Sequence, residues 1–81
     1  MAVNLGTLSG MLRFHRRRSG LTQAQLALLA GVGKTVVFDA EHGKLSIQID
    51  TLSKILDALN ISWHFRGPLM DEFEATQHEN R

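Results

Sequence analysis

Residues 22–43 constrain the fold of this chain more than any other stretch. They read as two short helices joined by a tight turn at residues 31–33. The hydroxyl of Thr22 can cap the first helix, while Gln25, three residues on, reaches back to complete a capping box. The stretch therefore predicts a helix that starts at Thr22 and a second helix that follows after a sharp reversal.

Small side chains give the first of these helices an inward face that another helix can cross closely. Leu26, Ala27 and Ala30 recur at the spacing of such a face. Gly31 suits a C-terminal cap with positive φ, and Val32 places one apolar side chain inside the turn. Together these features are the signature of a helix-turn-helix.

The second helix of the motif is expected from about Gly33 to His42. Its spacing turns Val37, Ala40 and Glu41 inward. The other side of this helix is what DNA would meet, and it carries Lys34, Thr35, Phe38 and Asp39.

Charge is distributed unevenly along the 81 residues, which allow one domain with a small core. Residues 1–20 carry four arginines and no acid, whereas residues 67–81 carry four acids against one arginine. A basic body suggests contacts with the phosphates of a nucleic acid. The alternative interpretation of the arginine run is a solvated helix end stabilised by the helix dipole.

Several classes of protein are disfavoured by what the sequence lacks. It has no cysteine, no apolar run long enough to span a bilayer and no signal-peptide pattern, so we expect a soluble, cytoplasmic, nucleoid-associated protein without membrane partners. Its four histidines lack the spacing of a helical metal site, and neither a Gly-rich phosphate loop nor a nucleophile elbow is present. We therefore expect no catalytic residue, no cofactor, no metal and no enzyme activity.

A further helix is expected before the motif, from about Thr7 to Arg18. Arg16 falls four residues after Leu12 and shares its inward face. It is the natural partner for the inward-facing Glu41, so a partly buried ion pair is predicted between the two.

After the motif, a helix is expected from about Ile49 to Leu59, with Asn60 as a left-handed cap. Residues 61–66 then alternate strictly between apolar and polar, which predicts a strand. The apolar face of this strand consists of Ile61, Trp63 and Phe65.

A lone strand cannot satisfy its own backbone, and the sequence shows no second strand pattern. The economical solution is pairing with the same strand of a second copy about a two-fold axis, which makes the protein a homodimer. The alternative is an irregular segment that folds back over its own core.

Two regions follow from this organisation: a helix-turn-helix domain with its dimerisation strand over residues 1–66, and a flexible acidic tail over residues 67–81. The tail could instead hold a partner-binding segment around Leu69, Met70 and Phe73. These side chains would form an apolar cluster if the segment became helical on binding.

The motifs at 21–27, 31–32, 41–44 and 56–59 together resemble the lambda-repressor-like, or Xre-type, helix-turn-helix family over residues 8–60. Within that family, Val37-Phe38, residues 41–44 and 48–51 and the terminal strand look most similar to HipB-type antitoxins. The resemblance implies a mainly α fold of four to five helices with one C-terminal strand pairing across a dimer. It also implies binding to operator DNA and to a HipA-type kinase toxin.

The same resemblance implies a DNA-binding set made up of Thr22, Gln23, Gly33, Lys34, Thr35, Phe38, Asp39 and Lys44. Chemistry agrees for Lys34, which can donate to guanine O6 or N7. Asp39 departs from the family pattern, because many relatives carry a basic or amide residue there. Gly33 also departs, since it replaces a serine-like cap, although its backbone N–H can still donate to a phosphate.

The predicted function is a sequence-specific transcriptional repressor that reads an inverted repeat and serves as the antitoxin of a HipBA-like toxin–antitoxin system. One alternative is a free-standing Xre-type regulator without a toxin. Another is a protein-interaction module, in which Phe38 and Asp39 face a partner protein rather than DNA.

Overall fold

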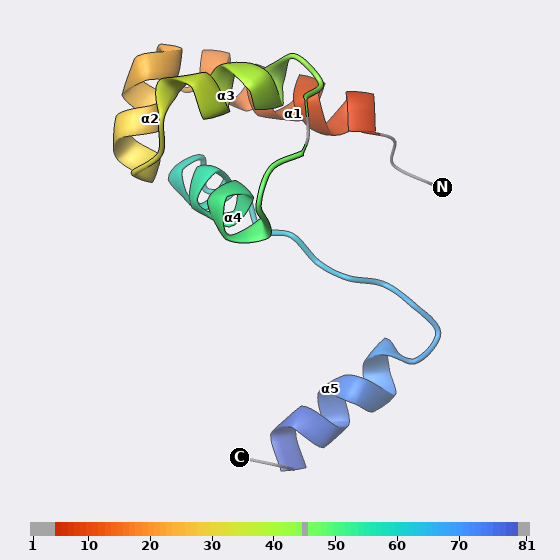
Figure 1. Ribbon diagram of the computed structural model, residues 1–81. Coiled ribbons are helices and arrows are strands. Elements are labelled where there is room, and N and C mark those ends of the chain that lie inside the picture. Colours follow the sequence, from red (N-terminus) through yellow and green to blue (C-terminus); the bar gives the residue numbers. More distant parts are fainter. Residues whose placement is uncertain (1–4, 45, 80–81) are drawn as a thin grey trace.

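The computed structural model describes residues 5–44 and 46–79. Within these residues it contains five helices and no strand (Figure 1). The helices are α1 (Leu5–Arg18), α2 (Gln23–Ala30), α3 (Lys34–Glu41), α4 (Ile49–Ala58) and α5 (Met70–Glu79). The predicted mainly helical class is confirmed, and Leu45, between α3 and α4, lies outside the described residues.

The first four helices enclose one small core. α2 packs against both α3 and α4, and α1 packs against α3 (Figure 1). The inward faces expected on α2 and α3 are buried as predicted, and Val32 fills the turn against the same core. The most deeply buried apolar side chains are Leu12, Leu26, Val37, Ala40, Ile55 and Leu56.

Local capping fixes both ends of α2. Thr22 Oγ1 accepts a hydrogen bond from the Gln25 backbone N–H at 3.0 Å, and Gln25 Oε1 accepts one from the Thr22 N–H at 2.8 Å. Gly31 ends α2 with a φ of 72°, a left-handed conformation that glycine adopts without steric cost. The predicted capping box and glycine cap are confirmed.

The segment that follows α4 leaves the bundle instead of folding back over it. Asn60 adopts the predicted left-handed conformation, with a φ of 59°. Residues 61–66 then run as an exposed connection without strand pairing (Figure 1). Ile61 packs partly against the core, whereas Trp63 and Phe65 are exposed, with their ring centroids 5.8 Å apart. Pairing of this segment with a second copy stays a prediction.

The acidic tail contains a helix, where the sequence analysis predicted a flexible segment and considered a helix only as the alternative on partner binding. α5 follows Gly67-Pro68 and stands apart from the four-helix bundle (Figure 1). Asp71 and Glu72 lie in its first turn, where negative charge is favoured by the helix dipole. The side chains of residues 71–77 are all exposed, so this helix buries little of its own surface.

Candidate nucleic-acid interface

The outward face of α3 is exposed, as its spacing predicted. Lys34, Thr35 and Phe38 are open to solvent, and Asp39 is half-buried. Gly33 is the N-cap of α3 and makes no side-chain cap hydrogen bond. Because the first backbone N–H groups of a helix have no intrahelical partner, this end of α3 can donate to an anion such as a phosphate.

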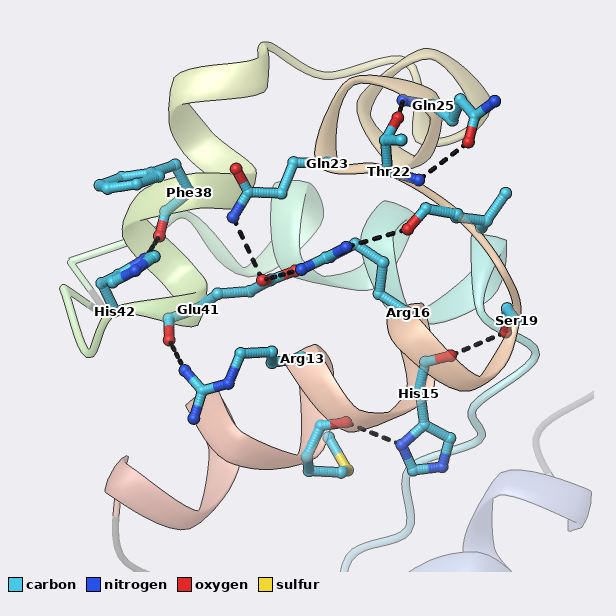
Figure 2. Close-up of polar contacts among 12 residues, drawn as sticks. Arg13, His15, Arg16, Ser19, Thr22, Gln23, Gln25, Phe38, Glu41 and His42 are labelled. Atoms are coloured by element: carbon cyan, nitrogen blue, oxygen red, sulfur yellow. Dashed lines mark hydrogen bonds and ion pairs between the residues drawn. The ribbon is translucent and has the colours of Figure 1, made fainter.

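Thr22 and Gln23 lie at the start of the neighbouring helix α2. They differ in which of their hydrogen-bonding groups remain free to contact DNA. Thr22 uses its oxygen to accept the cap hydrogen bond, so its hydroxyl hydrogen stays available for donation. Gln23 Nε2 donates to Glu41 Oε1 at 3.2 Å, which turns part of its amide inward (Figure 2). The sequence analysis predicted only a DNA-binding role for Gln23 and did not predict this hydrogen bond to Glu41.

A buried polar network around Glu41 joins α1, α2 and α3 (Figure 2). The Arg16 guanidinium holds the Glu41 carboxylate in a bidentate pair, with Nε to Oε2 at 2.6 Å and Nη2 to Oε1 at 2.9 Å. The two side chains are 11% and 1% exposed. The structure thus brings together the two residues that the sequence analysis paired.

Two further contacts of this network were not predicted from the sequence. Arg16 Nη1 donates to the Leu21 carbonyl at 2.9 Å, just before α2, and Arg13 Nη1 donates to the Glu41 carbonyl at 2.9 Å (Figure 2). Arg13 therefore binds the end of α3 from α1. Because residues of α1 form hydrogen bonds to Leu21, just before α2, and to Glu41 of α3, the exposed surfaces of α2 and α3 have a fixed relative orientation.

The carboxyl group of Glu41 is held in its charged form. Burial alone raises its pKa, but hydrogen bonds from Arg16 and Gln23, with the positive charges of Arg16 and Arg13, outweigh burial and lower the pKa below its ordinary 4.5. The hydrogen bond to Glu41 in turn raises the pKa of Arg16. The ion pair therefore persists across the neutral range.

This lowered pKa makes stability depend on pH. Because the folded-state pKa lies below the unfolded one, the contribution of Glu41 is complete above the unfolded pKa and is lost as the pH falls through the folded pKa. We expect the free energy of unfolding to drop on acidification below the ordinary glutamate pKa of 4.5. Urea unfolding across this range should show a shallower drop for Glu41→Gln, and an unchanged profile would contradict the assignment.

Phe38 makes an unpredicted contact with the end of its own helix. Its ring stacks on that of His42 with centroids 4.0 Å apart and an interplanar angle of 20°, and His42 Nδ1 lies 2.7 Å from the Phe38 carbonyl oxygen (Figure 2). The i, i+4 spacing of the two residues is the sequence signal that could have indicated it. The stack orients an apolar surface on the outward face of α3.

Asp39 and Lys44 lie beside a hollow of about 310 Å³ between α3 and the start of α4. The Lys44 backbone N–H donates to the Asp39 carbonyl at 2.9 Å, which closes the turn after α3. Asp39 is less exposed than Lys34, Thr35 and Phe38 on the same outward face. The hollow is lined by Val36, Asp39, Lys44, Ser46, Ile47, Gln48 and Thr51.

Neither a metal site nor a membrane-spanning helix is found in the part of the chain that the structure describes. There, no three His, Cys, Asp or Glu side chains gather where they could hold a metal ion. No helix among the same residues has the length and apolar character needed to cross a membrane.

Comparisons with known proteins identify the same helix-turn-helix fold. A helix-turn-helix family model matches residues 12–65. The crystal structure of the restriction-modification controller protein C.AhdI from Aeromonas hydrophila is similar at 31% identity and a TM-score of 0.67, covering 72% of this chain and 88% of that one. A search of curated proteins finds no match.

Two structures that contain HipB share the fold at lower identity. A complex of a HipB variant with an O2 20mer has 24% identity and a TM-score of 0.73, covering 84% of this chain and 94% of that one. A HipA–HipB–O2–O3 complex has 22% identity and a TM-score of 0.73, covering 84% and 96%.

Proposed function

This chain belongs to the helix-turn-helix family of DNA-binding regulators, and we propose that it is a dimeric repressor that reads an inverted repeat in its own upstream DNA. The observation that carries the proposal is the exposed α3 face of Lys34, Thr35 and Phe38, together with the capped start of α2. The Glu41 network fixes these two surfaces relative to each other. Such preorganisation lowers the ordering cost of binding.

In this proposal α3 enters the major groove of DNA. Lys34 donates to guanine O6 or N7, and Thr35 hydrogen-bonds or contacts a thymine methyl. The hydroxyl of Thr22 and the backbone N–H of Gly33 donate to phosphates, which set the register of the protein without reading sequence. Lys44, exposed after α3, adds positive charge near the same backbone. Asp39, half-buried beside the hollow, is a weaker candidate for base contact.

A dimer would place two copies of α3 on half-sites about one helical turn (34–36 Å), or a small multiple of it, apart. Footprinting on the upstream DNA tests this directly. We expect two protected half-sites related by inverted symmetry, because a two-fold dimer presents the same helix twice. Protection of one half-site, or none, would contradict the dimeric repressor.

The exposed residues after α4 support the dimer itself. We propose that Ile61, Trp63 and Phe65 pair with the same segment of a second copy, covering aromatic surface that the single chain leaves open. Trp63→Ala should weaken dimerisation by about 2 kcal/mol, or roughly thirtyfold, in sedimentation equilibrium. His64→Ala, on the other side of the same segment, is the matched control and should change little. A wild-type monomer at micromolar concentration would contradict the proposal.

We further propose that the protein is the antitoxin of a HipA-like kinase toxin. The fold that it shares with HipB, solved in complex with HipA, supports this role. The test is co-expression with the neighbouring gene product. A kinase-like neighbour whose toxicity is neutralised, and which co-purifies with this chain, is the expected result. An unrelated neighbour that neither binds nor harms the cell would leave a free-standing regulator.

A further inference from the structure

One surface of α1 lies outside the apolar core and the proposed DNA-binding face, although Arg13 at its edge also donates to the Glu41 carbonyl of α3. Its residues follow the spacing i, i+3, i+4, i+7, i+8, so they form a continuous stripe along the helix. They border a hollow of about 380 Å³. We call this stripe the α1 arginine face, and it consists of Gly10, Arg13, Phe14, Arg17 and Arg18.

The α1 arginine face combines positive charge with an uncovered aromatic ring. Phe14 is 57% exposed, and the Arg18 guanidinium carbon lies 5.3 Å from its ring centroid. Arg17 and Arg18 are exposed, and neither forms an ion pair among the described residues. A fitting occupant would carry an apolar side chain for Phe14 and carboxylates for the two arginines.

Helix α5 has the opposite charge and the same kind of apolar centre. Phe73 is 53% exposed and Leu69, one turn earlier, is 67% exposed. Glu72 and Glu74 flank Phe73 in the sequence and are also exposed. The start of the helix thus presents two exposed apolar side chains with carboxylates beside them.

We propose that α5 of one protomer packs on the α1 arginine face of a second copy. Phe73 would contact Phe14, and Glu72 and Glu74 would face Arg17 and Arg18. Charge complementarity selects this occupant, since the two surfaces match in charge and in apolar content. The contact would add a second interface to the proposed dimer, and it does not depend on DNA binding.

The exposed connection before α5 supports exchange between chains. Residues 60–69 carry α5 away from its own bundle (Figure 1). Residues 61–67, which lie between the Asn60 cap and the turn before α5, can span at most about 23 Å when extended, a length that lets α5 extend toward a neighbouring protomer. Exchange of this kind would leave each α5 covered without any change in the fold of the bundle.

Charge reversal in the full-length protein tests the pairing. Arg17→Glu with Arg18→Glu, or Glu72→Lys with Glu74→Lys, should each weaken self-association about tenfold in low-salt sedimentation equilibrium. All four changes together should restore most of the lost affinity, and added salt should reduce every difference. If the fourfold variant associates no better than the double variants, the pairing is wrong.

Engineered cysteines distinguish packing of α5 on a second protomer from packing of α5 on the α1 of its own chain. The native chain has no cysteine that would interfere. Gly10→Cys is tolerated sterically, since an added Cβ meets nothing within 4 Å, and Thr76→Cys lies one turn after Phe73. Mixing the two single variants under oxidising conditions should give mixed disulfide dimers in excess over like pairs. An intramolecular disulfide in the double variant, without mixed dimers, would overturn exchange in favour of folding back.

DNA titrations of the same variants distinguish this proposal from the proposed function. If reversal at Arg17 and Arg18 lowers DNA affinity and leaves self-association unchanged, the α1 arginine face contacts phosphates and the α5 proposal fails. In that case the repressor proposal would stand. If the fourfold variant recovers self-association but the protein does not bind its upstream DNA, the repressor proposal fails and the α5 proposal stands.

Discussion

Glu41→Ala is expected to destabilise the fold by about 3 kcal/mol, the range found when one partner of a buried ion pair is removed. The variant would leave the Arg16 guanidinium, only 11% exposed, with its charge uncompensated. Arg16 would lose both hydrogen bonds to the carboxylate and keep the one to the Leu21 carbonyl. Gln23 would lose its internal acceptor as well.

Urea unfolding followed by circular dichroism measures this loss. Asp57→Ala, which removes an exposed acid from α4, is the control and should stay within about 0.5 kcal/mol of wild type. Replacing both partners, as Arg16→Met with Glu41→Leu, should recover part of the stability because no charge remains buried. A Glu41→Ala protein that unfolds at the wild-type urea concentration would show that the pair contributes nothing.

Lys34→Ala is expected to weaken binding to the upstream DNA by about 1–3 kcal/mol, or roughly 5- to 150-fold. Lys34 is the exposed cation in the first turn of α3, where a groove-bound helix reaches base edges. If Lys34 contacts a guanine, the loss of affinity should be largest for DNA that carries the native base pair at that position. The preference at that position should relax in the variant.

A competition series over single-base substitutions in the site measures this effect. Lys54→Ala, which removes an exposed lysine from α4, serves as the matched control for loss of one positive charge. It should weaken all duplexes slightly and equally. Equal weakening of all sequences by Lys34→Ala would assign Lys34 to phosphate contact alone.

Local sequence signals predicted most of the bundle. The capping box of Thr22 and Gln25, the left-handed Gly31 and the left-handed Asn60 each depend on neighbours within a few residues. The inward faces of α2 and α3 followed from helical spacing alone. Such signals locate helices before any tertiary contact is known, which is why α1 to α4 lie within a few residues of their predicted bounds.

Contacts between helices were harder to predict. The sequence paired Arg16 with Glu41 because both face inward, but it did not show that Gln23 and Arg13 also reach Glu41. These contacts depend on how the helices cross, which spacing along one helix does not specify. The helix α5 was missed because its segment is polar and lacks a wide apolar face, and only the acids of its first turn favoured a helix.

The most direct test of the central claim is a fluorescence-anisotropy titration of the full-length protein against its upstream DNA and a scrambled duplex at two salt concentrations. We expect nanomolar binding with two chains per site, a clear preference for the native sequence at both salts, and weaker binding to both duplexes at higher salt. Equal, weak binding to both duplexes that vanishes with salt would show only basic attraction. That result would contradict a sequence-specific repressor and favour a protein-interaction module.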